Sequence, residues 1–264
     1  MKIAIDAGHG KEGGPGAVGP SGLKEAEVTL SLAGILSNYL VCLGQETLIL
    51  SRDFYSGERA VQAQKEKCDI LISLHCNAGS ASARGIEVWF PHDNEEGKRL
   101  ASSILQVLIA ETGAVSRGVK DDADWRPSPD WTGGMAILRN FPGPAVLLEL
   151  LFISNPVEEK LLASQEFLGK CAHAIALGTL DFINSWGKGG AKKMDNQKLD
   201  PFPDLPPTLW GGKARKIALV LHDLGILTGY EDGTFKPDQP ITRIEAASII
   251  YRALAYLGKL QTLE

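Results

Sequence analysis

The first 186 residues alternate between two hydrophobic patterns. Short apolar runs predict buried strands, which we expect at 1–6, 47–51, 69–75, 85–90, 136–139 and 145–152. Apolar residues at helical spacing predict helices, which we expect at 25–43, 57–67, 95–112, from 156 onward and at 167–186. Because helices separate the strands, we predict an α/β fold with a mixed, largely parallel sheet flanked by helices.

Local signals mark the ends of two of these helices. Gly44 follows the first helix and is expected to stop it. Asn155 can cap the helix that begins at Pro156, since proline is tolerated in a first turn. Glu158 lies at capping-box spacing from Asn155, so we expect its carboxylate to bond back to the cap.

The composition changes after residue 186, which predicts a domain at 1–186, a linker at 187–201 and a second domain at 202–264. Helical patterns at 212–224 and 242–257 predict a small all-α hairpin. Thr242 and Glu245 have capping-box spacing at the start of its second helix. One hairpin buries little apolar area, so we expect it to pack against another surface.

Composition and charge narrow the class of protein. The 264 residues are 44% hydrophobic and 22% charged, which is typical of a globular chain. The formal net charge of −5 argues against nucleic acid as the partner. Residues 1–186 carry 16 basic and 23 acidic side chains, and the rest of the chain carries 11 and 9, so the two parts have net charges of −7 and +2.

The sequence also makes predictions about location and cysteine chemistry. No apolar run reaches the length of a membrane span, so no membrane partner is expected. The chain enters a strand at once, which predicts synthesis in the cytoplasm without a signal peptide and action on its target after release. The cysteines lack metal or redox spacing and are expected to be buried free thiols; they are Cys42, Cys68, Cys76 and Cys171.

Three residues are candidate metal ligands. His9 and His75 each follow or end a predicted strand, at the edge where open α/β sheets place their ligand sites, and Glu25 begins the first helix. Two imidazoles and one carboxylate leave a tetrahedral zinc ion one open position, as in catalytic zinc sites. Histidines are more often ordinary polar residues, so both interpretations stay open at this point.

Glu149 interrupts the apolar run 145–152. A buried carboxylate is costly unless it is paired, hydrogen-bonded or close to a cation. One interpretation is an ion pair with Arg139 on the preceding predicted segment. The other makes Glu149 the general base beside a metal-activated water. The sequence alone does not separate these interpretations.

The order of short motifs over residues 2–186 resembles the zinc-dependent N-acetylmuramoyl-L-alanine amidases of the amidase-3 type. The motifs are Ile5-Asp6-Ala7-Gly8-His9-Gly10, Gly22-Leu23-Lys24-Glu25, Ser51-Arg52-Asp53, Ile72-Ser73-Leu74-His75-Cys76-Asn77-Ala78, Arg84-Gly85-Ile86-Glu87 and Leu148-Glu149-Leu150-Leu151-Phe152. The resemblance implies that His9, Glu25 and His75 bind Zn²⁺ and that Glu149 is catalytic. The substrate it implies is peptidoglycan, cleaved between N-acetylmuramic acid and L-alanine.

The sequence departs from the resembled family at two positions. Leu151 stands where the family usually has glycine, and Cys76 stands where it usually has alanine. Strand alternation predicts that Cys76 points away from His75 into the core. Candidate substrate-binding residues lie on loops and strand ends around the expected site, and ordinary packing is the alternative for each of them. They are Asn77, Arg84, Trp125, Trp131 and Arg139.

Residues 202–247 resemble the S-layer homology repeat. The match rests on Phe202-Pro203-Asp204-Leu205, Leu224-Gly225-Ile226-Leu227-Thr228-Gly229-Tyr230, Asp232-Gly233-Thr234-Phe235 and Ile241-Thr242-Arg243-Ile244-Glu245. The resemblance implies binding of an anionic secondary cell-wall polymer, with candidate residues Trp210, Gly229, Asp232 and Arg243. Such repeats usually occur in threes. Because this chain has one, we expect three chains to associate through their tails as a homotrimer.

Together these observations predict a peptidoglycan hydrolase that acts as a phage or prophage endolysin. The alternatives are a sporulation or wall-remodelling amidase of the host, a zinc carboxypeptidase that cuts another bond, and a non-catalytic wall-anchoring or assembly protein. Product analysis separates the two enzymes, since only an amidase frees the N-terminus of L-alanine.

Overall fold

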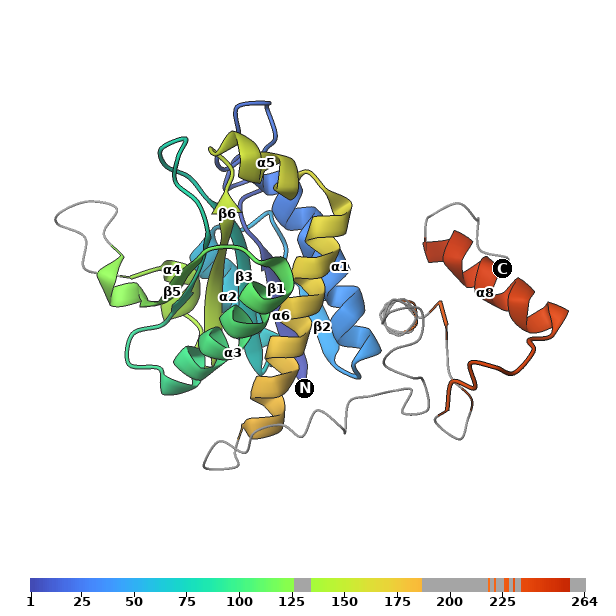
Figure 1. The fold of residues 1–264 in the computed structure, drawn as a ribbon. Helices are drawn as coiled ribbons and strands as arrows, with labels where there is room; N and C mark the ends of the chain where they lie inside the picture. The colour runs from blue at the N-terminus through green and yellow to red at the C-terminus, as the bar shows by residue number, and fades with distance from the viewer. Residues whose placement is uncertain are drawn as a thin grey trace. The chain divides into compact units, whose positions relative to one another are not determined.

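The computed structural model describes residues 1–125, 134–186, 218, 221, 226–227, 230 and 234–256. The chain divides into two compact units, Met1–Ala191 and Lys192–Glu264, which are described separately (Figure 1). Cys76 and Cys171 are buried, as expected, and Cys68 is half-buried. Cys42 is exposed, so the expectation of burial is wrong there, because it lies at the solvent side of the last helical turn.

A six-stranded sheet forms the centre of the first unit, with the strand order β2-β1-β3-β6-β4-β5. The strands are β1 (Lys2–Ala7), β2 (Glu46–Ile49), β3 (Ile70–Asn77), β4 (Ile86–Phe90), β5 (Ser116–Asp121) and β6 (Ala145–Phe152). Only the β4–β6 pair is antiparallel among these strands. The predicted mixed, largely parallel sheet is therefore confirmed.

Helices cover both faces of this sheet (Figure 1). The helices of the first unit are α1 (Glu25–Cys42), α2 (Ser56–Lys65), α3 (Glu95–Thr112), the short η1 (Asp122–Asp124), α4 (Ala136–Arg139), α5 (Pro156–Leu162) and α6 (Gln165–Ser185). Helices α1, α3 and α6 pack together on one face, whereas α2 and α4 contact each other on the other face. Each face of the sheet therefore has its own apolar core.

Two elements differ from the predictions. Residues 136–139 form helix α4 and not a strand, because Ile137 and Leu138 turn into the core beside α2. A four-residue apolar run is too short for periodicity to distinguish the two. Strand β5 was not predicted, since its sequence Ser-Arg-Gly-Val-Lys-Asp is mostly polar. It is an edge strand, where polar side chains are common.

In the second unit, the described residues include helix α8 (Arg243–Tyr256). The predicted capping box is confirmed: the Thr242 hydroxyl accepts from the Glu245 amide at 3.2 Å, and the Thr242 amide donates to the Glu245 carboxylate at 2.6 Å. The predicted helix at 212–224 lies largely outside the described residues. Within the described part of the chain, every helix falls short of the length and apolarity of a membrane span.

A buried ion pair ties α2 to the central strand β1. The Arg59 guanidinium donates to the Asp6 carboxylate and to the Ala7 carbonyl, and the Ser73 hydroxyl donates to the other Asp6 oxygen at 2.6 Å. Asp6 and Arg59 are both almost fully buried. Removing one partner of such a pair leaves an uncompensated charge in the core.

We expect Arg59→Met to lower the free energy of unfolding by about 3–5 kcal/mol, because it leaves the Asp6 carboxylate buried without a cation. Urea denaturation measures the change. Arg99→Met, which removes an exposed ion pair with Glu96, is the control and should cost less than about 1 kcal/mol. Adding Asp6→Asn to Arg59→Met should restore much of the loss; no restoration would show that packing, and not charge, dominates.

Candidate functional site

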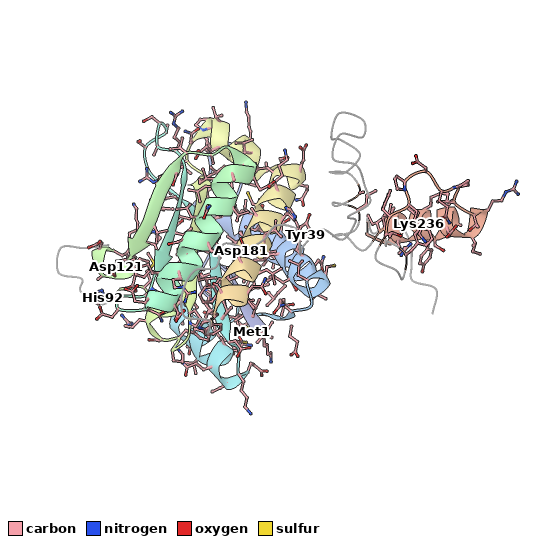
Figure 2. All side chains as sticks on the ribbon, turned by 60° about the horizontal axis from the view of Figure 1, so that its bottom comes forward. Met1, Tyr39, His92, Asp121, Asp181 and Lys236 are labelled. Atoms are coloured by element: carbon pink, nitrogen blue, oxygen red, sulfur yellow. The ribbon has the colours of Figure 1, made fainter. Side chains whose placement is uncertain are left out.

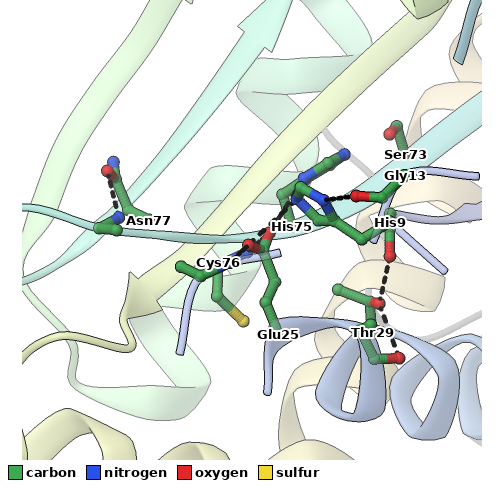
Figure 3. Close-up of polar contacts among 12 residues, drawn as sticks. His9, Gly13, Glu25, Thr29, Ser73, His75, Cys76 and Asn77 are labelled. Carbon is green, nitrogen blue, oxygen red and sulfur yellow. Dashed lines mark hydrogen bonds and ion pairs between the residues drawn. The ribbon is translucent and has the colours of Figure 1, made fainter. Parts of the chain in front are cut away.

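Three side chains from separate elements meet at one edge of the sheet (Figure 3). His9 follows β1, Glu25 begins α1, and His75 lies near the end of β3. His9 Nε2 is 3.1 Å from Glu25 Oε2, and His75 Nδ1 is 3.0 Å from Glu25 Oε1. One ligand atom from each residue lies within 4.8 Å of the other two. The parallel pairing of β1 and β3 brings the two histidines to the same edge.

The local backbone conformation orients the two imidazole rings. His9 adopts a left-handed conformation with φ of 64°, and its Nδ1 donates to the Gly13 carbonyl at 3.2 Å. With Nδ1 used in this bond, Nε2 is the nitrogen that faces Glu25. A Cβ at Gly8 would lie 2.5 Å from the His75 ring, and one at Gly16 would lie 2.7 Å from Glu25 Oε2. Both glycines are therefore required for the close approach of backbone to the cluster.

Glu25 is 3% exposed and is held by two backbone amides. The Cys76 amide donates to Oε1 and the Ala17 amide to Oε2, each at 2.9 Å. Burial opposes ionisation of Glu25, but the hydrogen bonds with His75 and His9, the charge on His75 and the Cys76 amide outweigh it and hold the pKa well below its usual range. The carboxylate therefore stays charged and attracts a cation.

His75 responds to the same negative potential. Burial alone would lower its pKa, but the hydrogen bond to Glu25 and the nearby charges of Glu149, Glu25 and Asp6 raise it. The imidazole of the metal-free protein is therefore easier to protonate than a free imidazole.

Arg52 joins the two segments that carry His9 and Glu25. Its Nε donates to the His9 carbonyl at 3.1 Å, and its Nη2 donates to the Ala26 carbonyl at 3.0 Å. The Thr29 hydroxyl donates to the Gly8 carbonyl at 2.8 Å, which adds a second link between α1 and the same loop. These contacts fix the loop after β1 against the start of α1, so they orient the ligands without touching a metal.

Glu149 lies beside His75, its register partner on β3. Its Oε2 is shielded from solvent and has no hydrogen-bond partner among the described residues. Burial, opposed by the charge of His75 and assisted by the charges of Glu25 and Glu87, raises the pKa of Glu149 to about 7. The alternative ion pair with Arg139 is wrong: no ion pair within the described residues includes Glu149, and Arg139 is exposed on α4.

The donor set fits a zinc ion. Two imidazole nitrogens and one charged carboxylate approach closely enough to share one ion, and the shielded oxygen of Glu149 lies next to them on the neighbouring strand. Cys76 is buried and donates its backbone amide to Glu25, and it is not part of the cluster. The chain therefore offers three protein ligands, one fewer than a tetrahedral zinc ion takes.

The turn that follows Glu149 has a strained backbone and is held by hydrogen bonds. Leu151 has a φ of 59°, in the left-handed region where a side chain is unfavourable. Glu158 holds this turn, because its carboxylate accepts from the Phe152 amide at 2.6 Å and from the Gly85 amide at 2.9 Å. Asn155 caps α5 as predicted, but the capping-box prediction for Glu158 is wrong, since its carboxylate is used by these two loops.

A second buried carboxylate, Glu87, was missed as a site residue. It is 4% exposed and pairs in register with Glu149 across β4 and β6. Four donors from β3, β4 and β5 surround it and, with Glu87, form what we call the Glu87 cluster. They are Asn77 Nδ2 at 3.0 Å, Trp89 Nε1 at 3.2 Å, Arg117 Nε at 2.7 Å and Lys120 Nζ at 2.8 Å.

Burial opposes ionisation of Glu87, but hydrogen bonds with Lys120 and Arg117 and their charges lower its pKa. The available sequence signal was the same as for Glu149, a carboxylate within the apolar strand 86–90.

The remaining predicted residues are dispersed. Asn77 belongs to the Glu87 cluster, and Arg84 is exposed in the loop before β4. Trp125 is partly buried and packs against the core on the α2 and α4 face, in agreement with the packing alternative. Arg243 is the exposed first residue of α8. Four predictions lie outside the described residues: Trp131, Trp210, Gly229 and Asp232.

A separate open hollow of about 680 Å³ lies over the last residues of β4 and β5. Trp89, Lys120 and Asp121 are among its lining residues, and the metal-ligand candidates are not. At its side, His92 Nδ1 is 3.0 Å from the Asp121 carboxylate, and the two side chains lie together in Figure 2. Trp89 and Lys120 also contact Glu87, which pairs in register with Glu149, whereas Asp121 and His92 lie farther along the chain, at and beyond the ends of β5 and β4.

Comparisons with known proteins match two parts of the chain to known families. The family described as N-acetylmuramoyl-L-alanine amidase, Amidase_3, matches residues 3–181, and the S-layer homology domain matches residues 201–247. YqiI of Bacillus subtilis (strain 168) is 33% identical over 181 residues, which cover 67% of this chain and 82% of YqiI. The endolysin of Bacillus phage SPP1 is 29% identical over 257 residues, which cover 91% of this chain and 86% of that protein.

A solved structure shares the fold. The N-acetylmuramoyl-L-alanine amidase from Clostridium difficile 630 matches with a TM-score of 0.63 at 25% identity, covering 70% of this chain and 98% of that one. With the family match extending over most of the chain and the fold in agreement, the chain belongs to the Amidase_3 family of N-acetylmuramoyl-L-alanine amidases.

Proposed function

We propose that this chain hydrolyses the amide bond between N-acetylmuramic acid and the L-alanine of the stem peptide, with a zinc ion held by His9, Glu25 and His75. The observation that carries the proposal is the convergence of three ligand atoms within 4.8 Å beside the unpartnered oxygen of Glu149. Family membership supports the choice of bond. The donor chemistry supports the choice of metal.

A bound zinc ion supplies Lewis acidity, which polarises a carbonyl group and makes water a stronger acid. Glu149 takes the proton of the attacking water and delivers it to the departing amine nitrogen, because an amide nitrogen leaves poorly unless it is protonated. A pKa of about 7 in the metal-free site suits a group that must both accept and donate a proton. Its register position beside His75 keeps this carboxylate next to one of the proposed metal ligands.

The second part of the proposal concerns anchoring. We propose that residues 202–264 attach the enzyme to the cell wall by binding an anionic secondary cell-wall polymer. The match to the S-layer homology domain supports this role, and Arg243 is an exposed cation available for it. The proposed role for the whole chain is that of an endolysin which reaches the wall after release from the cytoplasm. The similarity to the SPP1 endolysin over 91% of the chain supports that role.

We further propose that the tails of three chains associate. One S-layer homology repeat leaves apolar side chains on and next to α8 in solvent; they are Ile241, Ile244, Ile250 and Tyr251. Ile244 is 76% exposed. Burying such a surface between copies of the chain is favourable, and a closed threefold arrangement would rebuild the usual number of repeats.

The first test is hydrolysis of purified peptidoglycan. We expect roughly one zinc ion per chain and release of stem peptides with a new N-terminal L-alanine, both lost on chelation. Glu149→Gln should keep its zinc and fold but lose turnover by about a hundred- to ten-thousand-fold, since the proton carrier is gone. Glu111→Gln, which changes an exposed glutamate, is the matched control. Near-normal activity of Glu149→Gln would remove Glu149 from the mechanism, and products without free L-alanine would indicate another bond.

The raised pKa of Glu149 predicts a pH-dependent cost in the metal-free protein. From pH 4.5, its ordinary pKa, to about 7, the native state binds more protons at Glu149 than the unfolded chain does, so stability falls as pH rises. Metal-free Glu149→Gln should therefore be about 3 kcal/mol more stable than wild type at pH 8 and about equal at pH 4. Denaturation in the presence of chelator measures this difference. A gain of the same size at both pH values would point to packing instead of charge.

Sedimentation equilibrium tests the trimer. The mass of the full chain should rise with concentration from 28.3 kDa toward three times that value. Ile244→Lys combined with Ile250→Lys should stay monomeric, because charges replace the exposed apolar side chains of α8. Val157→Lys, at an equally exposed apolar position on α5, is the control and should associate like wild type. A mass of 28.3 kDa at every concentration contradicts the trimer.

A further inference from the structure

The Glu87 cluster holds more positive charge than its carboxylate neutralises. Arg117 and Lys120 both contact one oxygen of Glu87, at 2.7 Å and 2.8 Å, while Asn77 and Trp89 donate to the other. Two cations against one anion leave a surplus of one positive charge. Both basic side chains are also partly open to solvent, with 37% exposure for Arg117 and 31% for Lys120. The surplus charge can therefore be reached by a ligand.

The cluster lies on the same face of the sheet as the proposed catalytic groups. His75 pairs in register with Glu149, and Glu149 pairs in register with Glu87, so the three side chains form a row across β3, β6 and β4. Neighbouring strands lie about 4.8 Å apart, which puts Glu87 roughly 10 Å from His75. The charge of Glu87 raises the pKa of Glu149, in agreement with this proximity.

Aromatic rings hold the two cations in place. The Arg117 guanidinium lies 4.9 Å from the centre of the Phe152 ring, and Lys120 Nζ lies 5.2 Å from the centre of the Trp89 ring. Each cation is thus fixed by a ring on one side and by Glu87 on the other. Side chains that are already ordered lose little conformational entropy when they bind a ligand. A surface ion pair without such supports would be far more mobile.

The chemistry of the substrate indicates what would bind here. In uncleaved peptidoglycan the lactyl carboxyl group is consumed in the scissile amide, so the nearby negative charge belongs to the stem peptide. Its second residue is a glutamate linked through its side-chain carboxyl group, which leaves an α-carboxylate free. Two peptide residues extend at most about 7 Å, a distance comparable to that between the metal cluster and the Glu87 cluster.

We propose that Arg117 and Lys120 form a subsite for the free α-carboxylate of the stem-peptide residue that follows L-alanine. The proposal rests on the proposed amidase function and assigns the peptide side of the substrate to β4 and β5. Charge-assisted hydrogen bonds from a guanidinium and an ammonium group recognise a carboxylate well and a neutral carboxamide poorly. Cell walls in which this residue is amidated would therefore be poorer substrates.

Two soluble muramoyl tripeptides that differ only at this group, one carrying the carboxylate and one the carboxamide, test the proposal. For the full-length zinc enzyme we expect kcat/KM to be about tenfold higher for the acid, with most of the difference in KM. Lys120→Gln and Arg117→Gln should each lower kcat/KM for the acid and leave the value for the amide nearly unchanged. The ratio of kcat/KM for the acid to kcat/KM for the amide would then fall toward one. Thermal unfolding of each variant shows whether Glu87 still has enough support for folding.

Lys98→Gln is the matched control, since Lys98 also lies near a ring, that of Phe90, but on α3 and away from Glu87. It should keep the wild-type preference. Equal cleavage of acid and amide by the wild type, or an equal loss on both substrates in the two variants, overturns the subsite and leaves the amidase function standing. Failure of the wild type to cleave either substrate overturns the amidase function and the subsite with it.

Discussion

The site depends on three carboxylates that are buried at one edge of the sheet and compensated to different degrees. Glu87 has four side-chain donors, including two cations. Glu25 has two backbone amides and two imidazoles. The Oε2 of Glu149 has no partner among the described residues. Glu87, whose charge is neutralised by neighbouring donors, holds strands together. Glu25 keeps its negative charge and attracts a cation, and Glu149, which lacks such donors, has a pKa near neutrality. Environment alone thus gives chemically identical groups separate roles.

This arrangement has a cost in stability that the surrounding structure offsets. His9 and Leu151 both adopt left-handed backbone conformations next to the site, and each is less favourable there than glycine would be. Neighbouring contacts hold them: Arg52 bonds to the His9 carbonyl, and Glu158 bonds to the amide that follows Leu151. Leu151 is also almost fully buried, so burial of its side chain partly offsets the strain of its left-handed backbone conformation.

The sequence predicted much of this because the strongest signals were local. The apolar runs at 69–75 and 145–152 and the helix at 95–112 have clear periods, and the order of motifs led to the three metal-ligand candidates that the fold brings together. The wrong predictions concern segments whose structure depends on contacts between residues far apart in the sequence. Residues 136–139 are too short for periodicity, β5 is held by pairing with β4, and Glu158 bonds to two distant loops. Glu87 carried the same signal as Glu149, but its partners on β5 could not be identified without that strand.

The difference in net charge between residues 1–186 and the rest of the chain suggests what the tail contributes. Residues 1–186 carry a net charge of −7, so an anionic cell wall repels them at long range, although the repulsion is screened beyond about 10 Å at moderate ionic strength. The rest of the chain has a net charge of +2 and matches a cell-wall module. Tethering raises the effective concentration of the acidic part near its substrate without requiring that part to bind the wall tightly. The cations of the Glu87 cluster then act only at short range, where a single substrate carboxylate meets Arg117 and Lys120.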